Sequence, residues 1–228
     1  MVLVVPGGQG LFSLVQEAFH HKFDNGNRLR LTNQIHDVFR DWKWLANNIS
    51  SRPTRIAELA PTNPPHISGA CDAALTGMGG FFLAPTQGKT KACVWRAPFP
   101  PHIQSKLVTY TNIPGTITNS DSELAGTLAH NDIICQSLDA RENVVHTFSD
   151  NTPAVCWCRK LSTTATGPVA HLLRLQVIHQ RHHQCLAMFD HIAGTNNLLA
   201  DICSRAWHLT DDQLLTLFNS RYPQDAPW

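Results

Sequence analysis

Four acidic residues lie where separate predicted elements begin or end, and carboxylates gathered in this way can bind divalent cations. They are Asp72, Glu123, Asp150 and Asp201. Asp72 is flanked by small apolar residues, so its carboxylate is expected to be partly buried and to need a compensating charge. Mg²⁺ prefers oxygen ligands and needs only a few carboxylates. The four acids therefore predict a metal site, provided that the fold brings them together.

Each of these carboxylates also has a structural explanation. Ser120 and Glu123 have the spacing of a capping box before a helix. Asp150 could form an Asx turn ahead of the next helix, and Asp201 could pair with Arg205 at i,i+4. Taken singly, Glu123 and Asp201 favour the structural role, and Asp150 is evenly balanced. Only the occurrence of all four acids together favours a metal-binding, catalytic role over a structural one.

The bulk composition predicts a folded, non-membrane protein. The chain has 228 residues, of which 43% are hydrophobic and 15% charged, so a packed core is expected. It lacks a run of about 18 apolar residues that could span a membrane. The net charge of +1 means that any polyanion must be held by a local basic patch. Seven irregularly spaced cysteines predict reduced thiols and an intracellular location, cytoplasmic or nuclear.

The pattern of apolar residues and turn signals predicts a mixed α/β order. A proline-rich stretch at 58–66 is expected to link a helical segment to the rest. Strands are expected at 66–74, 79–85, 92–99, 143–150 and 185–193, with further extended pieces near 106–118. Helices are expected within 10–60, at about 121–137, from Thr152 or Pro153, at 167–183, after Asn196 or Asn197, and in the tail.

Four stretches containing these acids resemble parts of ribonuclease H domains in retroelement reverse transcriptases. They are CDAALTGMGGFF, NSDSELAGTLA, TFSDNTPAVCW and HIAGTNNLLADICSR, in the family's order and spanning about 66–206. Upstream, RLRLTNQIHDVFRDWKWL resembles the helical connection that follows the polymerase in such polyproteins. The resemblance predicts a connection-like segment at 1–60, a ribonuclease H-like domain at 61–208, and an amphipathic helix and tail at 209–228. The polymerase motif YxDD is absent from the sequence.

The resemblance implies a mixed five-stranded sheet flanked by helices, preceded by a small helical segment. It also implies hydrolysis of the RNA strand of RNA–DNA hybrids with two Mg²⁺ ions, which Mn²⁺ could replace. By the family pattern Asp72 would bridge both ions and Asp201 would help hold the ion at the attacking water. Glu123 and Asp150 would hold the ion at the leaving oxygen. A polymerase domain upstream in a longer polyprotein is the expected partner.

Residues beside the acids and one basic stretch are candidates for contacting the hybrid. Ser122, Asn151 and Thr152 could contact sugar hydroxyls or phosphates, although helix capping explains them equally well. The predicted basic patch consists of Arg159, Lys160, Arg174 and Arg181, together with His179, His182 and His183.

Three other functions remain open. The first is a catalytically inactive ribonuclease H-like connection or scaffold module that binds nucleic acid. The second is another nuclease of the same superfamily, such as an integrase or transposase. The third is zinc binding by HQRHHQC at 179–185, which lacks a second ligand pair at finger-like spacing.

Overall fold

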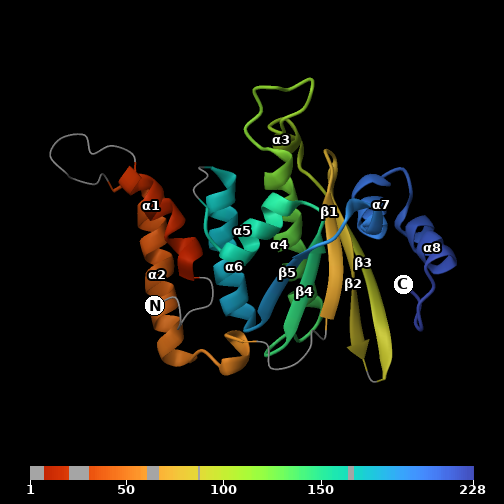
Figure 1. Cartoon of the computed structure of the whole chain (residues 1–228), viewed down its shortest axis with the longest axis horizontal. Helices are drawn as coiled ribbons and strands as arrows, with labels where there is room; N and C mark the ends of the chain where they lie inside the picture. The colour runs from red at the N-terminus through yellow and green to blue at the C-terminus, as the bar shows by residue number, and fades with distance from the viewer. Residues whose placement is uncertain (1–7, 21–30, 61–66, 87, 164–166) are drawn as a thin grey trace.

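The computed structural model describes residues 8–20, 31–60, 67–86, 88–163 and 167–228, and a mixed five-stranded sheet lies at its centre (Figure 1). The strand order is β3-β2-β1-β4-β5. β1 to β3 form an antiparallel meander, whereas β4 and β5 run parallel to β1. The strands are β1 (Ile67–Ala73), β2 (Gly77–Thr86), β3 (Lys89–Pro98), β4 (Val144–Ser149) and β5 (Leu186–His191).

Helices cover both faces of this sheet (Figure 1). On one face lie α4 (Asn119–Ser137), α5 (Thr152–Lys160) and α6 (Pro168–His183). On the other lie α7 (Leu198–Arg205) and α8 (Asp211–Arg221). The short α3 (Pro101–Gln104) follows β3, and the short η3 (Gly194–Asn196) precedes α7. This arrangement confirms the predicted fold class, a mixed five-stranded sheet flanked by helices.

Apolar side chains fill both interfaces between the sheet and its helices. Phe82, Val145 and Ile134 are fully buried in the cluster between the sheet and α4. On the other face Cys203 of α7 packs with Phe218 of α8. The predicted tail helix at 209–228 therefore packs against α7.

The N-terminal helical segment packs against α6. It contains η1 (Gly8–Leu11), α1 (Ser13–His20), α2 (Asn33–Ser51) and η2 (Ile56–Glu58). Leu11 and Leu45 share a buried cluster with Val177 of α6, and a second cluster joins Leu14 to Ala170. Residues 61–66 of the predicted linker lie outside the described residues. The boundaries at 60 and 208 stay predictions.

Three local expectations were wrong. Thr118, not Ser120, caps α4, because its hydroxyl accepts from the Asp121 amide while the Asp121 carboxylate accepts from the Thr118 amide. Asn151, not Thr152, caps α5, because its side chain accepts from the Ala154 amide at 3.0 Å. The stretch 106–118 forms turns and two isolated bridges instead of strands.

None of the helices in the described part of the chain is both long enough and apolar enough to cross a bilayer.

Candidate metal centre

The carboxyl ends of the parallel strands place two of the four predicted acids at one edge of the sheet. Asp72 is the sixth residue of β1, and Asp150 directly follows β4, which pairs with β1 in parallel. Asp72 is only 2% exposed. Its carboxylate accepts a hydrogen bond from the Ser204 hydroxyl of α7.

The third acid reaches this edge from α4. Glu123 lies in the second turn of the helix, past the cap formed by Thr118 and Asp121. Its carboxylate is therefore free of the capping role, and its Oε2 accepts from the Ala73 amide of β1 at 3.2 Å. Glu123 is 4% exposed, so its side chain is held inside the molecule beside Asp72.

Asp72, Glu123 and Asp150 form a group that can hold a divalent cation. One carboxylate oxygen from each residue lies within 4.8 Å of the other two. Buried carboxylates so close together repel one another and are poorly solvated, and both effects are relieved by a cation. Oxygen ligands of this kind suit Mg²⁺ or Mn²⁺ better than softer metals.

Burial and mutual repulsion raise the pKa values of two of these acids. The pKa of Glu123 rises to about 9, chiefly because burial disfavours the charged form and secondly because Asp72 and Asp150 are nearby. Burial also raises the pKa of Asp72, while Ser204 and Arg205 oppose the rise. Without a bound cation, Glu123 is therefore protonated at neutral pH.

Asp201 lies near this group and is joined to it through Arg205. Asp201 is in the first turn of α7, and its side chain is 44% exposed. Its carboxylate pairs with Arg205 at i,i+4, as the sequence predicted. The same guanidinium lies 3.6 Å from Asp72 Oδ2. Arg205 thus bridges Asp72 and Asp201, and Asp201 is not one of the three mutually close acids.

Two small structural features hold α7 against β1 and β2. A Cβ at Gly79 would lie 2.7 Å from the backbone carbon of Cys203, so only glycine allows this close approach. Asn197, just before α7, donates from Nδ2 to the Cys71 carbonyl of β1 at 3.1 Å. These contacts fix the positions of Ser204 and Arg205 relative to Asp72.

Two of the three polar residues predicted to contact substrate are engaged within their own helices, and the third is exposed. Ser122 is buried, and its hydroxyl donates to the Asn119 carbonyl at 2.8 Å. The Asn151 side chain caps α5. Thr152 is exposed at the first position of α5.

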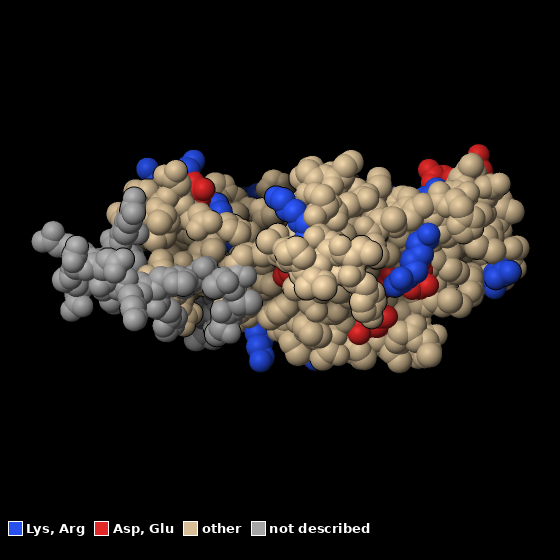
Figure 2. Space-filling view, turned by 90° about the horizontal axis from the view of Figure 1, so that it is seen from above, with Lys and Arg blue, Asp and Glu red and all other residues tan. Residues whose placement is uncertain are grey.

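The four basic residues of the predicted patch do not form one surface. Arg159 pairs with Asp190 of β5, and Arg174 pairs with Asp41 of α2. Lys160 is exposed at the end of α5. Figure 2 shows basic side chains of the described residues scattered over the face seen there, with acidic and basic atoms adjacent in several places.

The expectation for Arg181 was wrong. Arg181 is 3% exposed, and its guanidinium lies 3.1 Å from the Glu58 carboxylate. It also donates to Asn48 Oδ1 at 2.7 Å and to the Arg52 carbonyl. A side chain enclosed in this way joins α6 to the end of α2 and to η2, and cannot reach nucleic acid.

Three contacts at the site were not predicted. Ser204 and Asn197 contact β1 as described, and His191 Nε2 at the end of β5 lies 3.2 Å from the Asp150 carbonyl. The sequence offered one signal for Ser204, its position three residues after Asp201 on the same helix. It offered none for the contact of Asn197 with a strand 126 positions away.

Comparison with known proteins adds structural neighbours. No protein-family model matches the sequence, and no curated protein matches it significantly. Ribonuclease H1 of the halophilic archaeon Halobacterium salinarum overlaps with a TM-score of 0.42 and 10% identity, over 60% of this chain and 92% of that one. LC11-RNase H1, isolated from compost by a metagenomic approach, overlaps with a TM-score of 0.43 and 14% identity. That overlap covers 60% of this chain and 91% of the other.

Prototype foamy virus protease-reverse transcriptase is a further neighbour, with a TM-score of 0.32 and 10% identity. That overlap covers 82% of this chain and 22% of the viral chain. These likenesses concern the fold, and the chemistry of the site is inferred from the side chains described above.

Proposed function

We propose that this chain is a metal-dependent endoribonuclease that hydrolyses the RNA strand of RNA–DNA hybrids, as the ribonuclease H of a retrotransposon reverse transcriptase. The observation that carries the proposal is the group formed by Asp72, Glu123 and Asp150, whose carboxylate oxygens lie within 4.8 Å of one another. This group lies at the carboxyl edge of the parallel strands, the edge at which open α/β sheets commonly bind ligands.

The donor set fits two Mg²⁺ ions. Asp72, Glu123 and Asp150 would hold them, joined by Asp201 once its carboxylate leaves Arg205. When bound, such ions activate a water and stabilise the charge that develops on the scissile phosphate. Mn²⁺ prefers the same ligands and is the expected substitute.

The protein's own groups prepare this site. The Ser204 hydroxyl donates to Asp72, and the Ala73 amide donates to Glu123, so both carboxylates are held in place before an ion arrives. Glu123 must release the proton that its raised pKa retains at neutral pH. Metal binding is therefore expected to release protons and to strengthen as the pH rises.

Recognition of the hybrid is expected to rely on shape and on the 2′-hydroxyl groups of the RNA strand. The exposed candidates are Thr152, beside Asp150, and Arg159 and Lys160, at the other end of α5, although Arg159 pairs with Asp190. Because the net charge of the chain is only +1, binding by the isolated chain is expected to be weak and sensitive to salt. An upstream polymerase domain would supply the remaining affinity.

The test is a cleavage assay with end-labelled RNA–DNA hybrid, double-stranded RNA and double-stranded DNA, run with Mg²⁺, with Mn²⁺ and with chelator. We expect cleavage of the hybrid's RNA strand only, dependent on metal and lost in Asp72→Asn. Asp225→Asn, in the exposed C-terminal tail, is the matched control and should cut normally. Equal activity of Asp72→Asn and wild type would refute the assigned site.

A non-catalytic module that binds the hybrid is the second candidate, and Arg205 favours it. Its guanidinium lies between Asp72 and Asp201, where it partly neutralises the acids without a metal ion. If that pairing is permanent, a folded protein should bind hybrid without cutting it at any Mg²⁺ concentration. Isothermal titration with Mg²⁺ in the presence of uncleavable hybrid separates the two candidates, because only the nuclease takes up the ions.

A further inference from the structure

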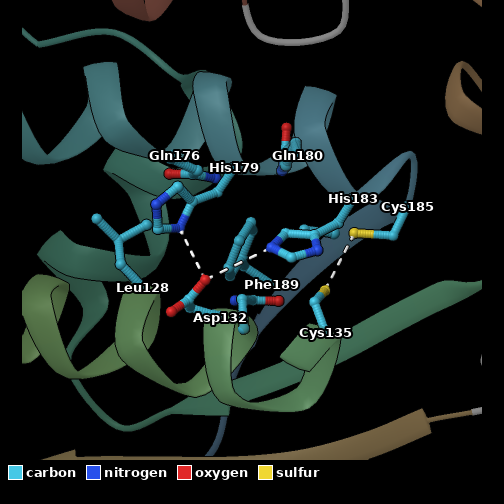
Figure 3. A pocket seen from close by; sticks show the side chains of 11 residues that line it. Leu128, Asp132, Cys135, Gln176, His179, Gln180, His183, Cys185 and Phe189 are labelled. Atoms are coloured by element: carbon cyan, nitrogen blue, oxygen red, sulfur yellow. Dashed lines mark hydrogen bonds and ion pairs between the residues drawn. The ribbon is translucent and has the colours of Figure 1, made fainter. Parts of the chain in front are cut away.

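A second cluster of potential metal ligands lies between α4 and α6, and it uses none of the residues of the acid group. Asp132 extends from α4, further toward the C-terminal end of that helix than Glu123. His179 and His183 extend from α6. The two histidines are four positions apart, so they lie on the same face of the helix. Figure 3 shows both imidazoles directed toward the Asp132 carboxylate.

The distances to Asp132 are suited to a single ion. His179 Nδ1 lies 3.3 Å and His183 Nε2 3.5 Å from the same oxygen, Asp132 Oδ1. Two ligand atoms held tetrahedrally at the usual zinc bond lengths of about 2.0–2.1 Å lie about 3.3 Å apart. The ligand atoms of these three residues do not all lie within 4.8 Å of one another, so the two imidazoles must turn toward each other to hold one ion.

The carboxylate is held in this orientation from behind. Gln136, one turn further along α4, donates from Nε2 to Asp132 Oδ2 at 2.6 Å. That bond occupies the oxygen facing away from the histidines and leaves Oδ1 for them. Partners of this kind orient metal ligands in protein sites and increase affinity.

The cluster borders a small cavity with an unsatisfied polar atom. The cavity has a volume of about 20 Å³, and the lining includes Asp132, His179, His183 and Gln176. A volume above about 10–15 Å³ holds one water-sized species. Gln176 is 2% exposed, and its Oε1 has no hydrogen-bond partner among the described residues. A water bound to an ion at this place is a donor of the kind that this acceptor lacks.

The chemistry of the lining selects the class of ion. Imidazole nitrogens suit zinc and similar borderline ions, while Mg²⁺ favours oxygen ligands and retains its waters. The thiols of Cys135 and Cys185, 3.6 Å apart, lie at the same cavity and add soft donors nearby (Figure 3).

We propose that Asp132, His179 and His183 bind one Zn²⁺ ion, with water as the fourth ligand, and that this ion fastens α6 to α4. Three protein ligands with a water is a common zinc arrangement. The partial exposure of His179, whose side chain is 42% exposed, gives the ion a route from solvent. The site is separate from the acid group, so it does not depend on the proposed nuclease activity.

The test is titration of the metal-stripped full chain with Zn²⁺, and with Co²⁺ as a spectroscopic probe, in excess Mg²⁺ so that the acid group is occupied. We expect one Zn²⁺ per chain, with affinity reduced at least about tenfold in Asp132→Asn and in His179→Gln. His182→Gln is the matched control, because His182 is exposed on the same helix and the two contacts with Asp132 are made by His179 and His183. Asp72→Asn should also bind Zn²⁺ normally.

The result that would overturn the proposal is equal Zn²⁺ affinity in Asp132→Asn, His179→Gln and wild type, or loss of binding in Asp72→Asn. Circular dichroism of each variant checks folding. If Asp132→Asn fails to fold, His179→Gln decides the question, because its side chain is the most exposed of the three. As a second readout, Zn²⁺ should raise the thermal unfolding midpoint of wild type and His182→Gln, and leave that of His179→Gln unchanged.

Discussion

Two regions of this molecule bury charged groups, and they do so in opposite ways. At the carboxyl edge of the sheet Asp72 and Glu123 lie beside Asp150, so that the ionised forms of the three carboxyl groups repel one another. Between α6 and η2, Arg181 and Glu58 form an ion pair in which both side chains are at most 2% exposed. The first arrangement weakens the fold until a cation arrives, whereas the second is already compensated. The difference separates a site arranged for binding from one arranged for folding.

The largest effect is expected on catalysis, from Glu123→Gln. The substitution keeps the shape of the side chain but removes the charge that a metal needs, so cleavage should fall by about 10²- to 10³-fold or more. Single-turnover cleavage of labelled hybrid with saturating Mg²⁺ measures the loss. Wild-type rates in this variant would show that the buried acid group is not where the chemistry occurs.

Removing one partner of the compensated pair should cost the most stability. Arg181→Ala leaves Glu58 buried without its partner, so the free energy of unfolding should fall by about 3–5 kcal/mol. Denaturant unfolding measures this. Arg40→Ala is the matched control, because the Arg40–Asp37 pair is exposed and should contribute about 1 kcal/mol or less.

The double variant Arg181→Met/Glu58→Leu sharpens the same comparison. It removes both charges at once, so much of the lost stability should return. If Arg181→Ala alone has no more effect than Arg40→Ala, the pair is not enclosed as the structure describes.

Removing a carboxylate from the acid group should raise stability, whereas Arg181→Ala lowers it. The size of the gain should depend on pH. The pKa of Glu123 is about 9 in the folded protein and about 4.5 when unfolded. The stability of the folded state that depends on protonated Glu123 is therefore fully present below about pH 4.5 and is lost as the pH rises toward 9. In chelator, Glu123→Gln should unfold at a higher temperature than wild type at pH 8, and the two should converge near pH 4.

Thermal unfolding of both proteins between pH 4 and 9, monitored by circular dichroism, measures that difference. Arg205 faces the group and lowers the pKa of Glu123, so Arg205→Met should extend the decline to higher pH and enlarge the total loss of stability. A wild-type protein that gains stability relative to Glu123→Gln as the pH rises would contradict the raised pKa.

The smallest effect concerns the helix that carries Glu123. Thr118→Ala removes the cap of α4 and should lower the free energy of unfolding by about 1 kcal/mol. Ser120→Ala lies within the helix and should change it by less than about 0.5 kcal/mol. Denaturant unfolding of the two variants distinguishes them. Equal losses would mean that the sequence-based cap at Ser120 also contributes.

The sequence predicted the parts of the fold that depend on neighbouring residues. The local pattern of apolar residues, turn residues and helix-start signals located α4, α6 and β5 to within a few residues, since these signals come from neighbouring positions. It was wrong at helix starts, where Thr118 and Asn151 compete with adjacent polar residues for the capping position. It also predicted extended pieces near 106–118, where the chain makes turns and two isolated bridges.

For the candidate site, the sequence by itself determined which acids to consider and which strands and helices carry them. Asp72, Glu123 and Asp150 were named from their positions, and the structure brings these three together. Their roles as metal ligands, and that of Asp201, stay predictions. Only the tertiary structure decided that Arg205 bridges Asp201 to Asp72, because that contact joins α7 to β1.

The basic stretch of α6 illustrates the same limit. The sequence determined that Arg181 and its neighbouring histidines share one helix, but not what each face of that helix meets. Packing encloses Arg181 with Glu58, 123 positions away, and brings His179 and His183 to Asp132 of α4. Local sequence fixes the spacing of side chains along a helix. The partners opposite them are fixed only when distant segments pack together, because burial decides which charges must be paired.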